Sequence, residues 1–240
     1  MFFFDIRYLI IMLPVMALTA WAQWRLRSVF SRYSNVRSQQ GMSGAQAARI
    51  LLDSQGLNFV PIEEMPRASA LDNHYDPSDR TLHLSPEVFR SNSVAAIGVA
   101  AHECGHAVQH AQGYAPMKAR TAMVPAVNIG SNLGVWLVMI GVIMALWFHA
   151  TGLVWVVWLG VALFALATVF ALLTLPVELN ASSRAMGLLT NAGLIDRTEY
   201  GETRAVLNAA AWTYVAGLAA AVGQLLYYVM IASGLSGRRR

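Results

Sequence analysis

Long apolar runs constrain this chain more than any other feature of its sequence. Residues 8–24, 124–148 and 153–175 each fall within the roughly 17 to 25 helical residues that cross a bilayer. A fourth run, residues 209–235, is weaker because Gly, Ala and Gln224 interrupt it. We therefore expect a mainly α membrane protein with about four transmembrane helices.

The composition of the chain agrees with this expectation. Of the 240 residues, 56% are hydrophobic and only 12% are charged, whereas soluble domains carry about 25% charged residues. Basic residues follow the first apolar run rather than precede it, and no small-residue cleavage site is evident. We therefore interpret residues 1–24 as a retained membrane anchor rather than a signal peptide.

We attribute the positive net charge of +4 to the orientation of the chain in the membrane rather than to nucleic-acid binding. The chain lacks the alternation of basic and aromatic residues that nucleic-acid binding favours. Placing the polar segments 25–120 and 177–204 on the cytoplasmic side puts 13 of the 17 basic residues there, as the positive-inside rule predicts. The tail of Arg238, Arg239 and Arg240 disagrees with this orientation, so whether the fourth helix spans fully stays open.

The apolar and polar runs divide the chain into five segments. We expect an anchor at 1–24, an aqueous peptidase segment at 25–122 and a transmembrane hairpin at 123–175. A helical segment at 176–204 and a C-terminal transmembrane helix with a basic tail at 205–240 complete the chain. Pro176 should end or kink the third membrane helix.

Local signals predict several elements within the aqueous segment. Ser43 is expected to cap a helix that runs to Gln55 and stops at Gly56. Short strands are predicted at residues 57–62 and 81–84, with a turn at 76–79 between them. An Ala-rich helix is expected from about residue 93 to 112.

The motif HECGH at residues 102–106 lies on this Ala-rich helix. His102 and His106 are four residues apart, so they share one face and can bind one metal ion. Zinc accepts histidine nitrogen, and catalytic zinc sites keep one position for water. Glu103 is then placed to act as the general base for that water.

Two histidines need a third ligand, and the rest of the sequence restricts the choice. Metzincins would require a histidine at position 112, which is Gln112. Site-2-type intramembrane proteases would require an Asp-Gly motif in a later helix, and the sequence contains none. Glu178 is the best candidate, because the membrane hairpin returns it to the face where the histidine helix enters the membrane.

Four motifs now resemble a known family: YDPSDRTLHLSPEVF, SVAAIGVAAHECGHAVQH, LPVELNASSRA and AAAWTYVAG. They are similar to the YugP-like neutral zinc metallopeptidases, and the resemblance covers nearly the whole chain. It implies a small α+β zinc peptidase domain of the gluzincin type, with His102, His106 and Glu178 as zinc ligands and Glu103 as the base.

The layout also resembles the HtpX and CAAX-processing Ste24 peptidases, in which the third-ligand segment looks like E-x-x-A-D. Ser182 stands at the position of that aspartate here. We therefore expect Ser182 or Asn180 to orient a ligand histidine, and Arg184 is a further candidate near Glu178. An edge strand that binds substrate backbone is predicted at Thr81, Leu82, His83 and Leu84.

These residues predict a membrane-embedded zinc endopeptidase that uses zinc-activated water and acts on membrane-associated proteins at the cytoplasmic face of the cell (inner) membrane. The alternative is a non-catalytic membrane scaffold or assembly factor that keeps zinc to stabilise its fold. Intact Glu103 argues for the enzyme, because a structural site needs no base. The sequence does not give the substrate, the oligomeric state or the roles of Cys104 and His110.

Overall fold

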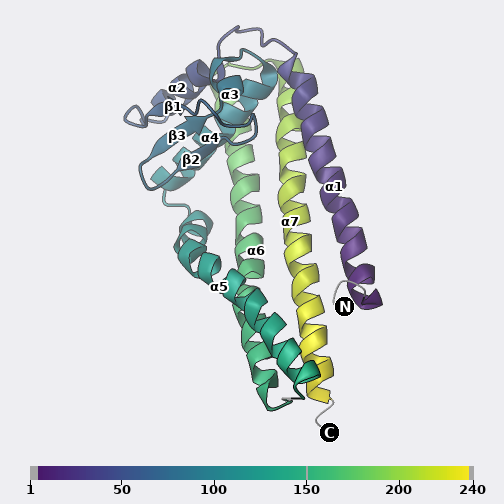
Figure 1. Cartoon of the computed structure of the whole chain (residues 1–240). Helices are drawn as coiled ribbons and strands as arrows, with labels where there is room; N and C mark the ends of the chain where they lie inside the picture. Colours follow the sequence, from purple (N-terminus) through teal and green to yellow (C-terminus); the bar gives the residue numbers. More distant parts are fainter. Residues whose placement is uncertain (1–4, 150, 238–240) are drawn as a thin grey trace. The chain divides into compact units, whose positions relative to one another are not determined.

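The computed structural model describes residues 5–149 and 151–237, and most of these residues are helical (Figure 1). In chain order the elements are α1 (Ile6–Ser34), α2 (Gly44–Ser54), β1 (Ile62–Glu64), β2 (His74–Asp76), β3 (Thr81–Leu84), α3 (Pro86–Arg90), α4 (Val94–Ala111), α5 (Ala115–Trp147), a short 3-10 helix (Thr151–Leu153), α6 (Val154–Asn191) and α7 (Arg197–Gly237).

The chain forms two compact units. The apolar unit comprises the described residues of Met1–Trp21, Ala119–Leu175 and Tyr214–Arg240. The mixed unit, which contains the sheet, comprises Ala22–Lys118 and Pro176–Thr213. The five segment boundaries predicted from the sequence stay a prediction.

Among residues 5–149 and 151–237, four helices are long and apolar enough to cross a membrane: α1, α5, α6 and α7. Together with the small three-stranded sheet, they confirm the predicted fold class. Residues 238–240, which raised the question about the fourth helix, lie outside the described residues.

Within the apolar unit, α5 and α6 approach each other closely at glycines. A Cβ atom on Gly134 would lie 2.8 Å from the carbonyl oxygen of Gly160. Small residues allow such close backbone contact, which is a common way to pack helices in lipid. The glycines therefore hold the predicted hairpin together.

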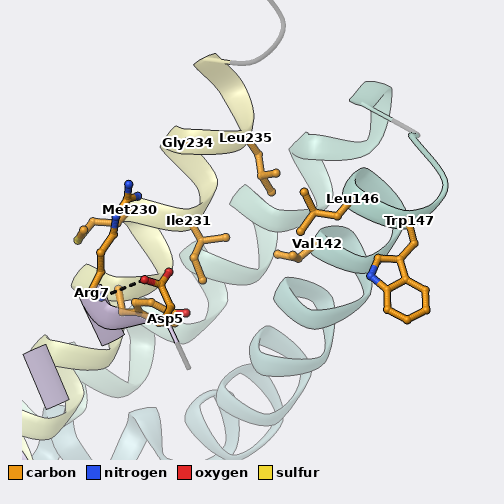
Figure 2. Close-up of a pocket in the computed structure, with 10 residues that line it drawn as sticks. Asp5, Arg7, Val142, Leu146, Trp147, Met230, Ile231, Gly234 and Leu235 are labelled. Atoms are coloured by element: carbon orange, nitrogen blue, oxygen red, sulfur yellow. Dashed lines mark hydrogen bonds between the residues drawn. The ribbon is translucent and has the colours of Figure 1, made fainter. Parts of the chain in front are cut away.

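The apolar unit also contains a cavity of about 310 Å³, shown in Figure 2. Its walls are largely apolar, with Val142, Leu146 and Ile231 among them. Asp5 provides the single carboxylate of this lining, and its Oδ1 accepts a hydrogen bond from the backbone N–H of Arg7 at 2.9 Å. One carboxylate without histidine or cysteine is a poor metal site.

In the mixed unit, α2 begins where the sequence predicts. The Ser43 side chain accepts a hydrogen bond from the backbone N–H of Gln46, and the Gln46 side chain accepts one from the N–H of Ser43. This capping box fixes the helix start. Gly56, with φ at +70°, takes the left-handed conformation that stops the helix at its C-terminal end.

The sheet has the order β1-β3-β2, with β1 parallel and β2 antiparallel to β3. The prediction that residues 81–84 form an edge strand is therefore wrong. Both edges of β3 are hydrogen-bonded to neighbouring strands, so its backbone has no free side for a substrate. The strand predicted at residues 57–62 is also displaced, because only Ile62 of that range belongs to β1.

The sequence predicted that Pro176 ends or kinks the third membrane helix. The helix α6 continues through Pro176 to Asn191, so a helix end at this position is wrong. Proline inside a helix costs about 3 kcal/mol because it removes a hydrogen bond and clashes with the preceding turn. Burial outweighs that cost here: Val177, Ala181, Ala185 and Leu189 recur every four residues and are fully buried. The helix therefore carries Glu178 on a rigid element rather than on a loop.

Candidate metal centre

The helix α4 starts at a side-chain cap and is buried along most of its length. The Ser93 side chain accepts a hydrogen bond from the backbone N–H of Ala96, as a typical N-cap does. Within the HECGH motif, only His102 is not buried. The structure thus places His102 and His106 on one face of a fixed helix.

Three side chains converge beside this face. Glu178 Oε2 lies 3.2 Å from His102 Nε2 and 3.4 Å from His106 Nε2. One donor atom from each of the three residues lies within 4.8 Å of the other two. No other group of this kind occurs within residues 5–149 and 151–237. The structure therefore brings together the three residues that the sequence nominated as ligands.

A glycine makes this convergence possible. A Cβ atom on Gly105 would lie 2.6 Å from the carbonyl oxygen of Ala181 on α6. Because that distance is too short for any real Cβ, α4 and α6 can approach this closely only with glycine at position 105. The close approach brings the two histidines within reach of Glu178.

The carboxylate of Glu103 is buried and held by the edge strand β2. Glu103 Oε2 accepts a hydrogen bond from the backbone N–H of Tyr75 at 3.0 Å. Burial raises the pKa of Glu103 above its ordinary value, although the charges of His102 and His106 act in the opposite direction. A carboxylate with a raised pKa is suited to exchanging a proton near neutral pH.

Tyr75 also connects Glu103 to the C-terminal half of α4. Its hydroxyl oxygen lies 2.8 Å from His110 Nδ1, and burial raises the pKa of this hydroxyl to about 12. His110 is not part of the three-residue group. The structure therefore places it beside Tyr75 and not among the candidate ligands.

Gln109 is a residue that the sequence interpretation missed. Its Oε1 lies 3.0 Å from His106 Nδ1, while its Nε2 donates to the Val177 carbonyl and to Asn180 Oδ1. Both amide hydrogens of Gln109 are donated to α6, so Oε1 can only accept a hydrogen bond from His106 Nδ1. In the neutral form of His106 the proton therefore lies on Nδ1, and the lone pair of Nε2 is available to a metal ion. A glutamine three residues after the second histidine was the available signal, because residues three apart share a helix face.

Of the three other residues predicted near the site, Ser182 contacts a candidate ligand, whereas Asn180 and Arg184 bond to other polar side chains. Ser182 Oγ lies 3.2 Å from His102 Nδ1, so it contacts a candidate ligand directly. Asn180 contacts Gln109 and Arg184 instead of a histidine. Arg184 donates to Asn180 Oδ1 and to Gln112 Oε1, which places it at the outer end of this polar network.

The residues of the predicted substrate strand do not line this cluster. Leu82 and Leu84 are fully buried in the hydrophobic core. His83 lies 3.5 Å from the Asp79 carboxylate, and its ring lies 4.9 Å from that of His74. β2 is the edge strand that reaches the site, through the backbone of Tyr75.

Cys104 lies on the side of α4 that packs against α2. Its Sγ is 3.6 Å from the Ala48 carbonyl oxygen, and the side chain is fully buried. Burial raises the pKa of its thiol, so the reactive thiolate form is disfavoured. It is a packed small side chain at this interface.

The donor set fits a zinc ion. Two imidazole nitrogens and one carboxylate, on two helices, match a catalytic site that keeps a fourth position open. Burial disfavours a charged His106, but its hydrogen bond to the Glu178 carboxylate and the negative charges of Glu103 and Glu178 outweigh burial and raise its pKa. The surroundings therefore favour positive charge between these side chains.

Comparison with known families agrees with this donor set. The family model described as "Putative neutral zinc metallopeptidase" matches residues 8–233. Because the match covers nearly the whole chain, the protein belongs to this family, and the resemblance inferred from its four motifs is confirmed.

A curated relative gives the same family assignment. The chain is 39% identical over 231 residues to "Putative membrane protease YugP" of Bacillus subtilis (strain 168), covering 96% of this chain and 98% of that protein. No solved structure matches the chain.

Proposed function

We propose that this protein is a membrane-embedded, zinc-dependent endopeptidase of the gluzincin type. The observation that carries the proposal is the convergence of His102 Nε2, His106 Nε2 and Glu178 Oε2 within 4.8 Å. Two histidines from an HExxH helix and a glutamate from a second helix define that type. Family membership supports the class of activity.

Each side chain has one role in the proposed reaction. His102, His106 and Glu178 hold the zinc ion, and Ser182 and Gln109 fix the two imidazole rings through their Nδ1 atoms. Zinc, when bound, acts as a Lewis acid that polarises the scissile carbonyl and makes water easier to deprotonate.

Glu103 moves the proton. It takes a proton from the attacking water while the water oxygen bonds to the carbonyl carbon. It then delivers the proton to the leaving nitrogen as the C–N bond breaks, so the products are a carboxylate and an amine. The hydrogen bond from the Tyr75 amide keeps the carboxylate of Glu103 in place for both steps.

The substrate class and the orientation follow from the membrane character of the chain. Four candidate spans accompany the site, so the substrates we propose are membrane-associated proteins. The basic residues of the polar segments favour the cytoplasmic side of the cell membrane.

Glu103→Gln tests the mechanism directly. The variant keeps the shape of the side chain and removes the base, so it should retain near-stoichiometric zinc and lose at least about a hundredfold in cleavage rate. Elemental analysis and cleavage of casein by the detergent-solubilised protein measure the two effects. Full activity in this variant would exclude the mechanism.

Glu178→Ala provides the matched test of the ligand set. We expect it to lose zinc, and an unchanged metal content would show that Glu178 is not a ligand. If the wild-type protein binds zinc but cleaves no protein substrate, and Glu103→Gln changes nothing measurable, the scaffold alternative replaces the enzyme.

A further inference from the structure

A groove of about 550 Å³ lies between the C-terminal half of α6 and the N-terminal part of α7, within the mixed unit. Its lining mixes apolar and polar side chains and is almost uncharged; Ser182, Ser183, Thr190 and Asn208 contribute hydrogen-bonding groups. Among the described residues that line it, none is acidic, and Arg204 is the one with a full charge.

One residue, Ser182, connects the groove to the candidate metal centre. Ser182 lines the groove and also lies 3.2 Å from His102 Nδ1. His102 is the one residue of the HECGH motif that is not buried. A molecule lying in the groove therefore lies near the Nδ1 side of His102, which is the side that Ser182 contacts.

The shape of the groove fits an extended polypeptide. Its lining runs along α6 from Leu179 to Asn191, which corresponds to about 18 Å of helix. An extended chain advances about 3.3 Å per residue, so the groove accommodates roughly five residues. Side-chain hydroxyl and amide groups along it can pair with both the N–H and the C=O groups of such a chain.

Arg204 gives the groove its charge preference. The side chain is exposed, and it has no hydrogen bond or ion pair with any residue in the described part of the chain. By contrast, Arg49 and Arg90 each pair with a carboxylate. An unpaired guanidinium beside neutral hydrogen-bonding groups favours an anionic partner.

We propose that this groove binds the substrate segment next to the scissile bond, and that Arg204 selects an acidic side chain within about five residues of that bond. The inference rests on the proposed peptidase function and adds a substrate preference to it. Arg204 acts as a specificity residue and takes no part in the chemical step.

Peptide binding tests the preference separately from cleavage. The probes are fluorescent peptides of about ten residues, built from alanine, serine and leucine, with one glutamate moved through each position. Their affinity is measured by anisotropy on the full-length Glu103→Gln protein in detergent. An exposed ion pair corresponds to at most about 1 kcal/mol, so we expect an affinity gain of up to about fivefold at the favoured position.

Substitutions at Arg204 should change that preference in a predictable way. Arg204→Gln should abolish the gain, and Arg204→Glu should transfer it to peptides with lysine at the same position. Arg197→Gln, on the same helix but outside the groove lining, should keep the glutamate preference. A purely structural role for Arg204 would not produce this exchange of charge preference.

Two results would overturn the inference. One is equal binding of all peptides by the parent protein, and the other is an unchanged glutamate preference in Arg204→Gln. If Arg204→Gln instead loses only binding to vesicles containing phosphatidylglycerol, the groove binds lipid headgroups. Cleavage of the same peptides by wild-type protein tests the proposed function, so its failure is distinguishable from failure of the groove.

Discussion

Two helix crossings in this protein each depend on a glycine, but the close contact has a different consequence at each. In the apolar unit, Gly134 allows the backbone of α5 to approach Gly160 on α6. In the mixed unit, Gly105 allows α4 to approach Ala181 on α6. The first crossing is surrounded by apolar side chains, whereas the second is bordered by His102, His106 and Glu178.

The difference shows what glycine contributes at each crossing. Close packing alone is enough to hold a membrane hairpin together. At the α4–α6 crossing the same closeness also sets the distance between the candidate ligands on two helices, and a metal site tolerates little error in that distance. The α5–α6 crossing therefore affects stability alone, whereas the α4–α6 crossing affects both stability and the geometry of the candidate metal centre.

The largest expected effect comes from adding one methyl group at each crossing, which tests whether the two glycines differ in their effect on zinc binding. Gly105→Ala and Gly134→Ala each place a Cβ against a backbone oxygen, so each should destabilise its unit by about 1–3 kcal/mol. Only Gly105→Ala should also lose zinc, because it moves the histidines away from Glu178. Thermal unfolding measures the stability of both variants, and elemental analysis measures their zinc content. Equal zinc content in the two variants would refute the proposed difference between the crossings.

The polar network behind His106 provides a smaller test. Gln109→Leu removes the group that holds His106 Nδ1 and leaves the Val177 carbonyl without its donor. Loss of such a partner typically costs 10- to 100-fold in metal affinity, measurable by competition with a chromophoric chelator. Gln112→Leu, which contacts only the distant Arg184 end, should stay within about twofold. Similar affinities for both variants would contradict the role assigned to Gln109.

Cys104→Ala changes the side of α4 that faces α2 rather than the side that carries the histidines. It should have the smallest effect of these substitutions. Cys104 packs against Ala48, so removing its sulfur should cost about 1 kcal/mol of stability. Zinc content and cleavage should remain at wild-type levels. A loss of zinc in this variant would place the thiol in the metal centre.

The sequence predicted the elements whose signals are local. Ser43 is an N-cap as expected, the Ala-rich helix expected from about residue 93 begins at Val94, and residues 81–84 form a strand. The spacing of His102 and His106 placed both on one face of a helix, and the return of the hairpin nominated Glu178. The structure brings these three side chains together.

What could not be predicted depends on contacts between distant segments. Strand β2 has only three residues and Pro77 follows it, which is too short for an alternating apolar pattern. The sequence therefore did not predict that β2 pairs with one edge of β3. Pro176 is a strong local signal for a helix end, but the buried stripe beyond it decides the outcome. Gln109 lies between Val108 and His110 in the sequence, and only the position of α6 reveals its partners Val177 and Asn180.

The hydrogen bond that holds Glu103 has a consequence for how this protein tolerates mutation. Its donor is the main-chain N–H of residue 75 rather than a side chain. Nineteen of the twenty amino acids supply the same group, and only proline lacks it. Substitutions at residue 75 can therefore alter the contact with His110 while the hydrogen bond to the Glu103 carboxylate stays in place.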